Sequence, residues 1–65
     1  MEFKEMEKAQ NKIMEMIDSV GIVTVEWASK ELKKSREDTT MILEGLRRRG
    51  DLAGVNDGYA RRKSF

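Results

Sequence analysis

The chain has 65 residues and a formal net charge of +1, with 38 % charged residues and neither cysteine nor histidine. A chain of this length holds one domain and buries only about 60 % of the surface that its unfolded form exposes. Without cysteine and histidine it lacks the usual disulfide framework, thiolate nucleophile, imidazole base and zinc ligands. The composition therefore argues against an enzyme, and we expect no cofactor and no metal.

Charge is divided unevenly along the sequence. Residues 1–32 hold four basic against seven acidic residues, a balance of −3, whereas residues 33–65 hold nine against five, a balance of +4. This asymmetry favours an anionic partner for the second half, and a mixed-charge surface explains it equally well. No apolar run approaches the roughly 20 residues of a membrane span, and the N-terminus is unlike a signal peptide. We expect a soluble, cytoplasmic protein.

Residues 2–19 contain no glycine or proline, and apolar side chains recur there at spacings of three and four, which predicts one long helix. Gly21 is suited to end it in a left-handed conformation. The stripe consists of Phe3, Met6, Gln10, Ile13, Ile17 and Val20. Two interpretations stay open. Either the stripe packs inside one domain with an N-terminal extension over residues 1–12, or two copies pair as a homodimer through Phe3, Met6, Gln10 and Ile13.

The segment from residue 24 to residue 50 predicts two short helices around a tight turn, a helix-turn-helix. Thr24 is placed to cap the first helix, which starts near Val25 and runs to about Lys34. Ser35 is placed to cap the second, and Gly50 to end it. The apolar positions that would pack the two helices together are Val25, Trp27, Ala28, Leu32, Thr39, Ile42, Leu43 and Leu46.

Residues 51–63 predict a β-hairpin. The segment 51–55 is expected to form one strand, Asn56, Asp57 and Gly58 the turn, and residues 59–62 the returning strand. A lone hairpin is marginally stable in water, so it should pair with the β-branched segment 22–25. We expect Trp27 to be buried and Tyr59 to support the hairpin.

The order helix, strand, helix, turn, helix, hairpin resembles the winged-helix family over about residues 13–62. The resemblance is carried by the frame T-V-E-W-A-x-K-E-L-x-x-S-R-x-x-T-x-x-I-L-x-x-L-x-x-x-G-D-L, which begins at Thr24. It implies one domain over residues 1–65 that is α+β and mostly α, with three helices and a two- to three-stranded antiparallel wing. Small archaeal and viral regulators are similar in style, as are the C-terminal winged-helix domains of archaeal replicative helicases.

The resemblance implies a transcriptional regulator that contacts double-stranded DNA through the third helix and the wing. The alternative use of the fold is a protein-interaction module or an accessory domain of a larger replication or transcription machine. No small-molecule effector is expected. The residues expected to contact DNA are Ser35, Arg36, Thr40, Met41, Glu44, Arg47 and Arg48 on the third helix, and Arg61, Arg62 and Lys63 on the wing.

Some of these residue types argue against DNA binding. Carboxylates such as Glu37 and Glu44 are repelled by a phosphate-walled groove unless they accept a hydrogen bond from cytosine. Basic residues at a helix C-terminus, as in the run 47–49, are favoured by the helix dipole whatever the partner. The pattern therefore supports phosphate contacts better than the reading of bases.

Overall fold

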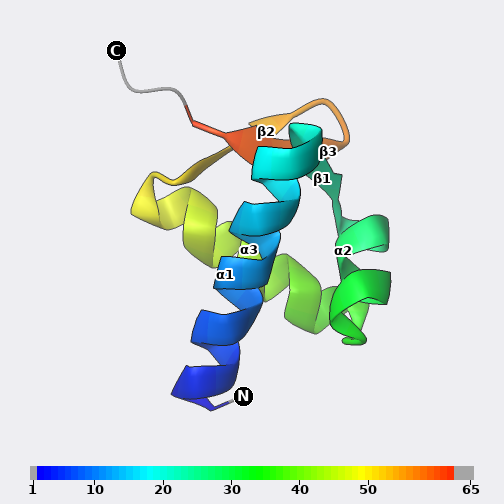
Figure 1. Ribbon diagram of the computed structural model, residues 1–65, viewed down its shortest axis with the longest axis vertical. Helices are drawn as coiled ribbons and strands as arrows, with labels where there is room; N and C mark the ends of the chain where they lie inside the picture. The colour runs from blue at the N-terminus through cyan, green and yellow to red at the C-terminus, as the bar shows by residue number, and fades with distance from the viewer. Residues whose placement is uncertain (1, 63–65) are drawn as a thin grey trace.

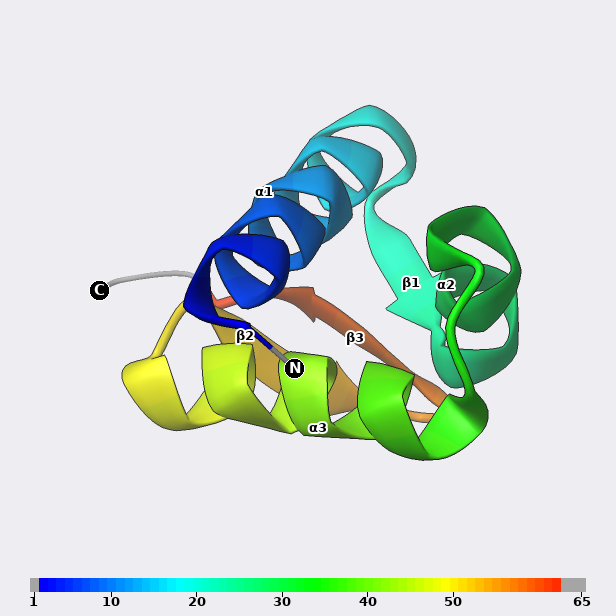
Figure 2. The ribbon, with the colours of Figure 1, turned by 90° about the horizontal axis from the view of Figure 1, so that it is seen from below.

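The computed structural model describes residues 2–62, which form three helices and a three-stranded antiparallel sheet. The elements are α1 (Phe3–Val20), β1 (Ile22–Thr24), α2 (Val25–Leu32), α3 (Arg36–Arg49), β2 (Leu52–Val55) and β3 (Gly58–Arg61). Helices α1 and α3 cross each other, and α2 lies beside the N-terminal end of α3 (Figures 1 and 2). The predicted fold class is confirmed: an α+β, mostly helical chain in a winged-helix layout.

The helix boundaries follow the predicted capping residues. The Thr24 hydroxyl accepts a hydrogen bond from the backbone N–H of Trp27 at 3.1 Å and starts α2. The Ser35 hydroxyl accepts from the N–H of Asp38 at 3.1 Å and starts α3. A cap of this kind is worth about 1 kcal/mol. Gly50 ends α3 with a φ of 91°, a conformation that a side chain rarely allows.

The predicted end of the first helix of the motif was wrong by two residues. Helix α2 ends at Leu32, because Lys33 adopts a left-handed conformation with φ 56°. The Lys34 N–H then closes the helix end by donating to the Ser29 carbonyl at 3.1 Å. The turn before Ser35 is consequently made of two lysines rather than being the last turn of a helix.

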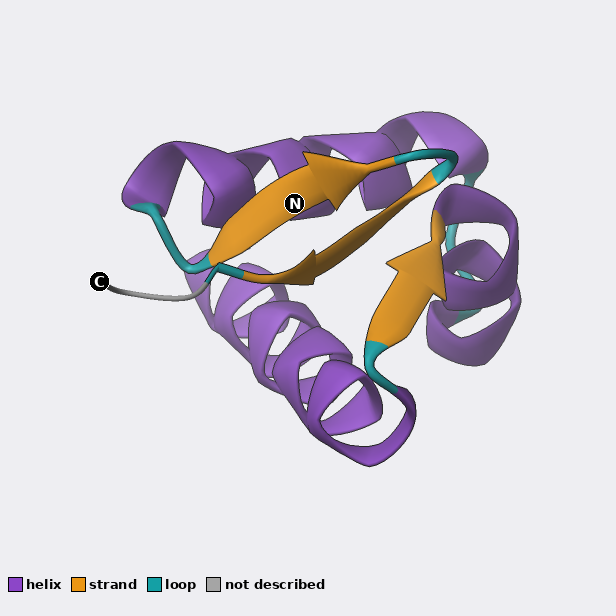
Figure 3. Cartoon of the chain, turned by 90° about the horizontal axis from the view of Figure 1, so that it is seen from above, coloured by secondary structure: helices purple, strands orange, loops and turns teal. Residues whose placement is uncertain are grey.

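The sheet has the strand order β1-β3-β2, so β3 pairs with both neighbours. Figure 3 shows α3 lying behind the hairpin of β2 and β3. The hairpin turn is Asn56-Asp57 alone, whereas Gly58 is already the first residue of β3. This corrects the predicted turn. A Cβ at Gly58 would lie 2.7 Å from the Val23 carbonyl oxygen, so glycine is needed there for the close approach of β1 and β3.

The core lies between the three helices and the sheet. Its buried hydrophobic residues are Ala9, Ile13, Met16, Ile17, Val23, Ala28, Ile42, Leu43, Leu46 and Leu52. Thr39 is also fully buried, and its hydroxyl is satisfied by donating to the Ser35 carbonyl at 2.8 Å. Trp27, which was expected to be buried, is only partly buried and packs against this core from outside. Tyr59 is also partly buried and packs against the core.

At Ile13, the structure decides whether α1 packs within its own domain or pairs with a second copy. Ile13 is 0 % exposed within the core of its own chain, so it is not available to a second copy. The expectation that Ile13 contributes to a dimer contact is therefore wrong. Val20, expected to join the same packed stripe, is instead 60 % exposed.

Candidate nucleic-acid interface

The outer face of α3 is the surface on which most of the predicted contacts fall. Because Thr39, Ile42, Leu43 and Leu46 are buried, the remaining positions of the helix are turned away from the core. Arg36, Met41, Arg47 and Arg48 are exposed, and Thr40 and Glu44 are half-buried. The capping residue Ser35 is exposed at the start of the helix. The structure thus places all seven predicted α3 positions on one accessible side or at its edge.

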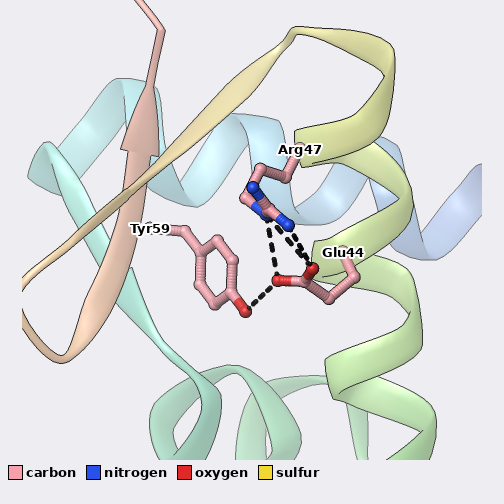
Figure 4. Close-up of polar contacts among 3 residues, drawn as sticks. All are labelled: Glu44, Arg47 and Tyr59. Atoms are coloured by element: carbon pink, nitrogen blue, oxygen red, sulfur yellow. Dashed lines mark hydrogen bonds and ion pairs between the residues drawn. The ribbon is translucent and has the colours of Figure 1, made fainter.

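Three residues on α3 and the hairpin are joined by hydrogen bonds that the sequence did not predict (Figure 4). The Arg47 guanidinium donates to Glu44 Oε1 from Nη2 at 2.9 Å and from Nε at 3.1 Å, and Nε also lies 3.2 Å from Oε2. The Tyr59 hydroxyl donates to Glu44 Oε2 at 2.7 Å. We call Glu44, Arg47 and Tyr59 the α3–hairpin clasp.

The clasp changes the ionisation of its members. The hydrogen bonds from Arg47 and then from Tyr59 lower the pKa of Glu44. The same bonds raise the pKa of Arg47 and of Tyr59, because both donate to the carboxylate. Glu44 is therefore ionised at neutral pH and balances the charge of Arg47 directly. Two of the predicted contact residues consequently engage each other.

The basic residues of the wing lie at the base of the hairpin rather than at its turn. Arg61 is paired in register with Leu52, the first residue of β2, and its Nη2 lies 2.8 Å from Asp18 Oδ1 on α1. Arg62 donates its N–H to the Asp51 carbonyl at 3.0 Å. The strand register thus directs Arg61 toward α1, and its contact with the DNA backbone or minor groove stays a prediction. Lys63 lies outside the described residues.

The hairpin turn, which is the other end of the wing, carries Asn56 and Asp57. Both are exposed, and Asn56 has a positive φ of 45°. With Glu44, Arg47 and Tyr59 they line a surface hollow between α3 and the hairpin. The turn thus places the carboxylate of Asp57, and no basic side chain, beside α3.

A second group of basic residues lies at the N-terminal end of α3. Lys33 and Arg36 are exposed and Lys34 is half-buried. Within residues 2–62, the ion pairs closer than 4.0 Å involve none of these three. We call Lys33, Lys34 and Arg36 the turn cations. The sequence-based prediction placed Lys33 and Lys34 at the end of the first helix of the motif and not among the DNA contacts, although their place directly before a capping serine was a usable signal.

Comparison with protein-family models, with curated proteins and with solved structures finds no match to this chain.

Proposed function

We propose that this chain is a winged-helix domain that binds double-stranded DNA through α3, as a small transcriptional regulator in the cytoplasm. The observation that carries the proposal is the group of turn cations at the start of α3. Within residues 2–62, no carboxylate forms an ion pair with any of these three residues. Lysine and arginine contacts to phosphate supply most of the affinity of such domains. The helices of residues 2–62 include none long and apolar enough to cross a membrane.

The proposed contacts differ along α3. Arg36 contacts a phosphate or a guanine edge, and Lys33 and Lys34 contact phosphates. The free N–H groups of the first turn of α3 favour an anion at the same place. Further along, the exposed face offers Met41, which is 61 % exposed and carries no hydrogen-bonding group suited to bases. The domain is therefore expected to bind DNA with modest sequence preference.

The test is a fluorescence anisotropy titration of a labelled mixed-sequence duplex at about 50 mM and about 200 mM salt. We expect binding that weakens with salt, with a slope of log affinity against log salt of about −2 to −3 for two or three phosphate contacts. Glu2→Ala, which changes a charge at the start of α1 and not on α3, should shift this curve little. Absence of binding at both salt concentrations, or binding that does not respond to salt, would overturn the proposal.

A second candidate function, a protein-interaction module, is favoured by Met41. This large apolar side chain stands exposed on α3 beside the carboxylate of Glu37, and neither residue suits a phosphate-lined groove. Met41→Glu should then abolish capture of a protein partner while leaving the fold intact, since the side chain is outside the core. Unchanged capture by the Met41→Glu variant would rule out this surface.

Homodimer formation through α1 is proposed on a smaller surface than the sequence suggested. Phe3 is 81 % exposed and Met6 is half-buried beside it. Gln10 accepts a hydrogen bond from Arg49 Nη1 at 3.1 Å, so its amide already has a partner within the chain. Sedimentation of the wild type and Phe3→Ser distinguishes the states: a dimer that the substitution dissociates supports the contact, and a monomer in both contradicts it.

A further inference from the structure

Glu44 is an acidic residue in the middle of the proposed DNA-binding face, where its charge opposes phosphate. Both of its carboxylate oxygens are nevertheless occupied: Oε1 accepts from Nε and Nη2 of Arg47, and Oε2 accepts from Tyr59 and, at 3.2 Å, from Arg47 Nε. The carboxylate is thus held from the helix side and from the hairpin side at once (Figure 4). Hydrogen bonds from α3 and from the hairpin therefore fix the position of the carboxylate.

We propose that Glu44 is an internal competitor for DNA phosphate, which keeps Arg47 in the clasp and so limits the affinity of α3 for the duplex. The inference rests on the proposed function, because it concerns the same surface. It makes Glu44 a positioning residue: it acts through Arg47 and does not itself contact DNA.

The geometry of the pair supports a competition. A guanidinium binds a carboxylate and a phosphate through the same pair of parallel N–H groups, so Arg47 cannot serve both with its Nε and Nη2. The Arg47 side chain is 50 % exposed, and it therefore remains accessible to an anion that approaches α3. An exposed ion pair of this kind is weak enough to exchange.

Tyr59 distinguishes the clasp from a simple pair within a helix. Glutamate and arginine three residues apart meet on many helix surfaces and separate readily. Here the Tyr59 ring packs against the core while its hydroxyl holds Oε2 at 2.7 Å. The carboxylate is consequently kept next to Arg47 when an exposed glutamate would otherwise turn into solvent.

The decisive experiment compares Glu44→Gln with Glu37→Gln in the duplex titration. Both substitutions remove one negative charge from the exposed side of α3, but Glu37 takes part in none of the ion pairs within residues 2–62. Glutamine also retains hydrogen-bonding groups for Arg47 and Tyr59, so the fold is preserved. We expect Glu44→Gln to tighten binding about three- to tenfold more than Glu37→Gln, and to steepen the salt slope by about one unit.

Two further variants assign the effect to Arg47. In an Arg47→Gln background, Glu44→Gln should tighten binding no more than Glu37→Gln does, because no guanidinium is left to release. Tyr59→Phe removes the hydroxyl that holds Oε2 beside Arg47, so it should tighten binding in the same direction as Glu44→Gln but by less. Unchanged affinity of Tyr59→Phe would mean that the hydroxyl does not keep the carboxylate beside Arg47. An excess effect of Glu44→Gln that persists without Arg47 would show that repulsion by the charge, not competition, is the cause.

The outcomes separate this inference from the proposed function. If the wild type binds DNA and the two glutamine variants tighten binding equally with equal salt slopes, competition by Glu44 is refuted and the DNA-binding function stands. If neither the wild type nor any variant binds at low salt, both are refuted. Only an excess effect that requires Arg47 supports the inference.

Discussion

The two ends of α3 carry the same kind of side chain in opposite situations. At its N-terminal end, the turn cations take part in none of the ion pairs within residues 2–62. Toward its C-terminal end, Arg47 pairs with Glu44 at 2.9 Å and Arg49 with Asp51 at 3.2 Å. A count of basic residues along the sequence treats these ends alike. Within residues 2–62, two of the three arginines at the C-terminal end are paired and Arg48 is not, whereas none of the three turn cations is paired.

Local geometry accounts for the difference. Glu44 and Arg47 are three residues apart and so meet on one face of the helix, and the left-handed Gly50 turns the chain so that Asp51 lies near Arg49. At the other end, Glu37 and Asp38 lie in the first turn of α3, where the helix dipole favours carboxylates without any basic partner. Acidic residues therefore pair with Arg47 and Arg49 at the C-terminal end of α3, whereas at the N-terminal end they stabilise the helix.

The largest expected effect on DNA affinity comes from neutralising the turn cations at the N-terminal end of α3. The double variant Lys34→Gln/Arg36→Gln should weaken duplex binding about tenfold or more at low salt and reduce the salt slope by about two units. Its stability should change by less than about 0.5 kcal/mol, since neither side chain is in the core. The measurements are the anisotropy titration and thermal unfolding.

The control for this variant is Lys8→Gln/Lys12→Gln, which removes the same charge from exposed positions on α1. Lys8 and Lys12 line the same surface hollow as Lys34, so this control removes charge from the vicinity of the turn cations without changing them, and it should weaken binding less than the tested variant. Equal weakening by the two double variants would mean that net charge, not the position of the turn cations, governs binding.

The next effect, on stability, concerns Ser35, which caps the N-terminal end of α3 beside the turn cations. Ser35→Ala removes the acceptor for the Asp38 N–H and should destabilise the fold by about 1 kcal/mol. Ser29→Ala is the matched control: the Ser29 hydroxyl donates to the Glu26 carbonyl inside α2 and caps nothing, so its loss should matter little. Urea titration of both variants measures the difference. A Ser29→Ala variant as unstable as Ser35→Ala would contradict the capping role.

The contribution of the α3–hairpin clasp to the stability of the fold should depend on pH. Glu44 has a lowered pKa in the folded chain, so its contribution to stability is present above the ordinary carboxyl pKa and is lost as the pH falls. Tyr59 has a raised pKa, so its contribution is present below the ordinary phenol pKa of about 10 and is lost as the pH rises beyond it. The clasp is thus intact from about pH 5 to about pH 10.

Tyr59→Phe tests this window. Between about pH 5 and about pH 10 the variant should be less stable than the wild type by no more than about 1 kcal/mol, because a single intramolecular hydrogen bond contributes a net free energy of about that size. Thermal unfolding at a series of pH values should show the gap narrowing as the pH falls toward about 2, because protonation of Glu44 removes the acceptor; the lowered pKa of Glu44 moves this loss below the ordinary carboxyl range. A gap that stays constant down to that pH would mean that the hydroxyl stabilises the fold without Glu44.

Sequence reasoning was accurate where the determinants are local. Thr24, Ser35 and Gly50 mark helix ends through hydrogen bonds or a φ that involve only neighbouring residues, and these boundaries were confirmed. The exposed face of α3 was also predictable, because burial of one side of a helix fixes the other. The exception among local features was Lys33, whose left-handed φ lacks the signal that a glycine would have given.

The remainder of the site depends on contacts between distant residues. Tyr59 meets Glu44 fifteen positions away, and Arg61 meets Asp18 forty-three positions away. Both contacts follow from how β3 aligns with β1 and β2, and one residue of shift in that register would turn each side chain to the other face. The turn residues of the hairpin were predicted one position too long, which left the register undetermined.

The smallest expected effect is that of Asp18→Asn, which releases Arg61 from its ion pair on α1. The two side chains are 57 % and 56 % exposed, so the loss should change stability by less than about 0.5 kcal/mol. Like Glu44→Gln, this variant removes one acid and frees one arginine, but at the base of the hairpin beside α1. We therefore expect duplex affinity to change by less than about twofold with an unaltered salt slope. If Asp18→Asn instead tightens binding as much as Glu44→Gln, then freeing any arginine is sufficient, and the difference between the two ends of α3 does not decide where DNA binds.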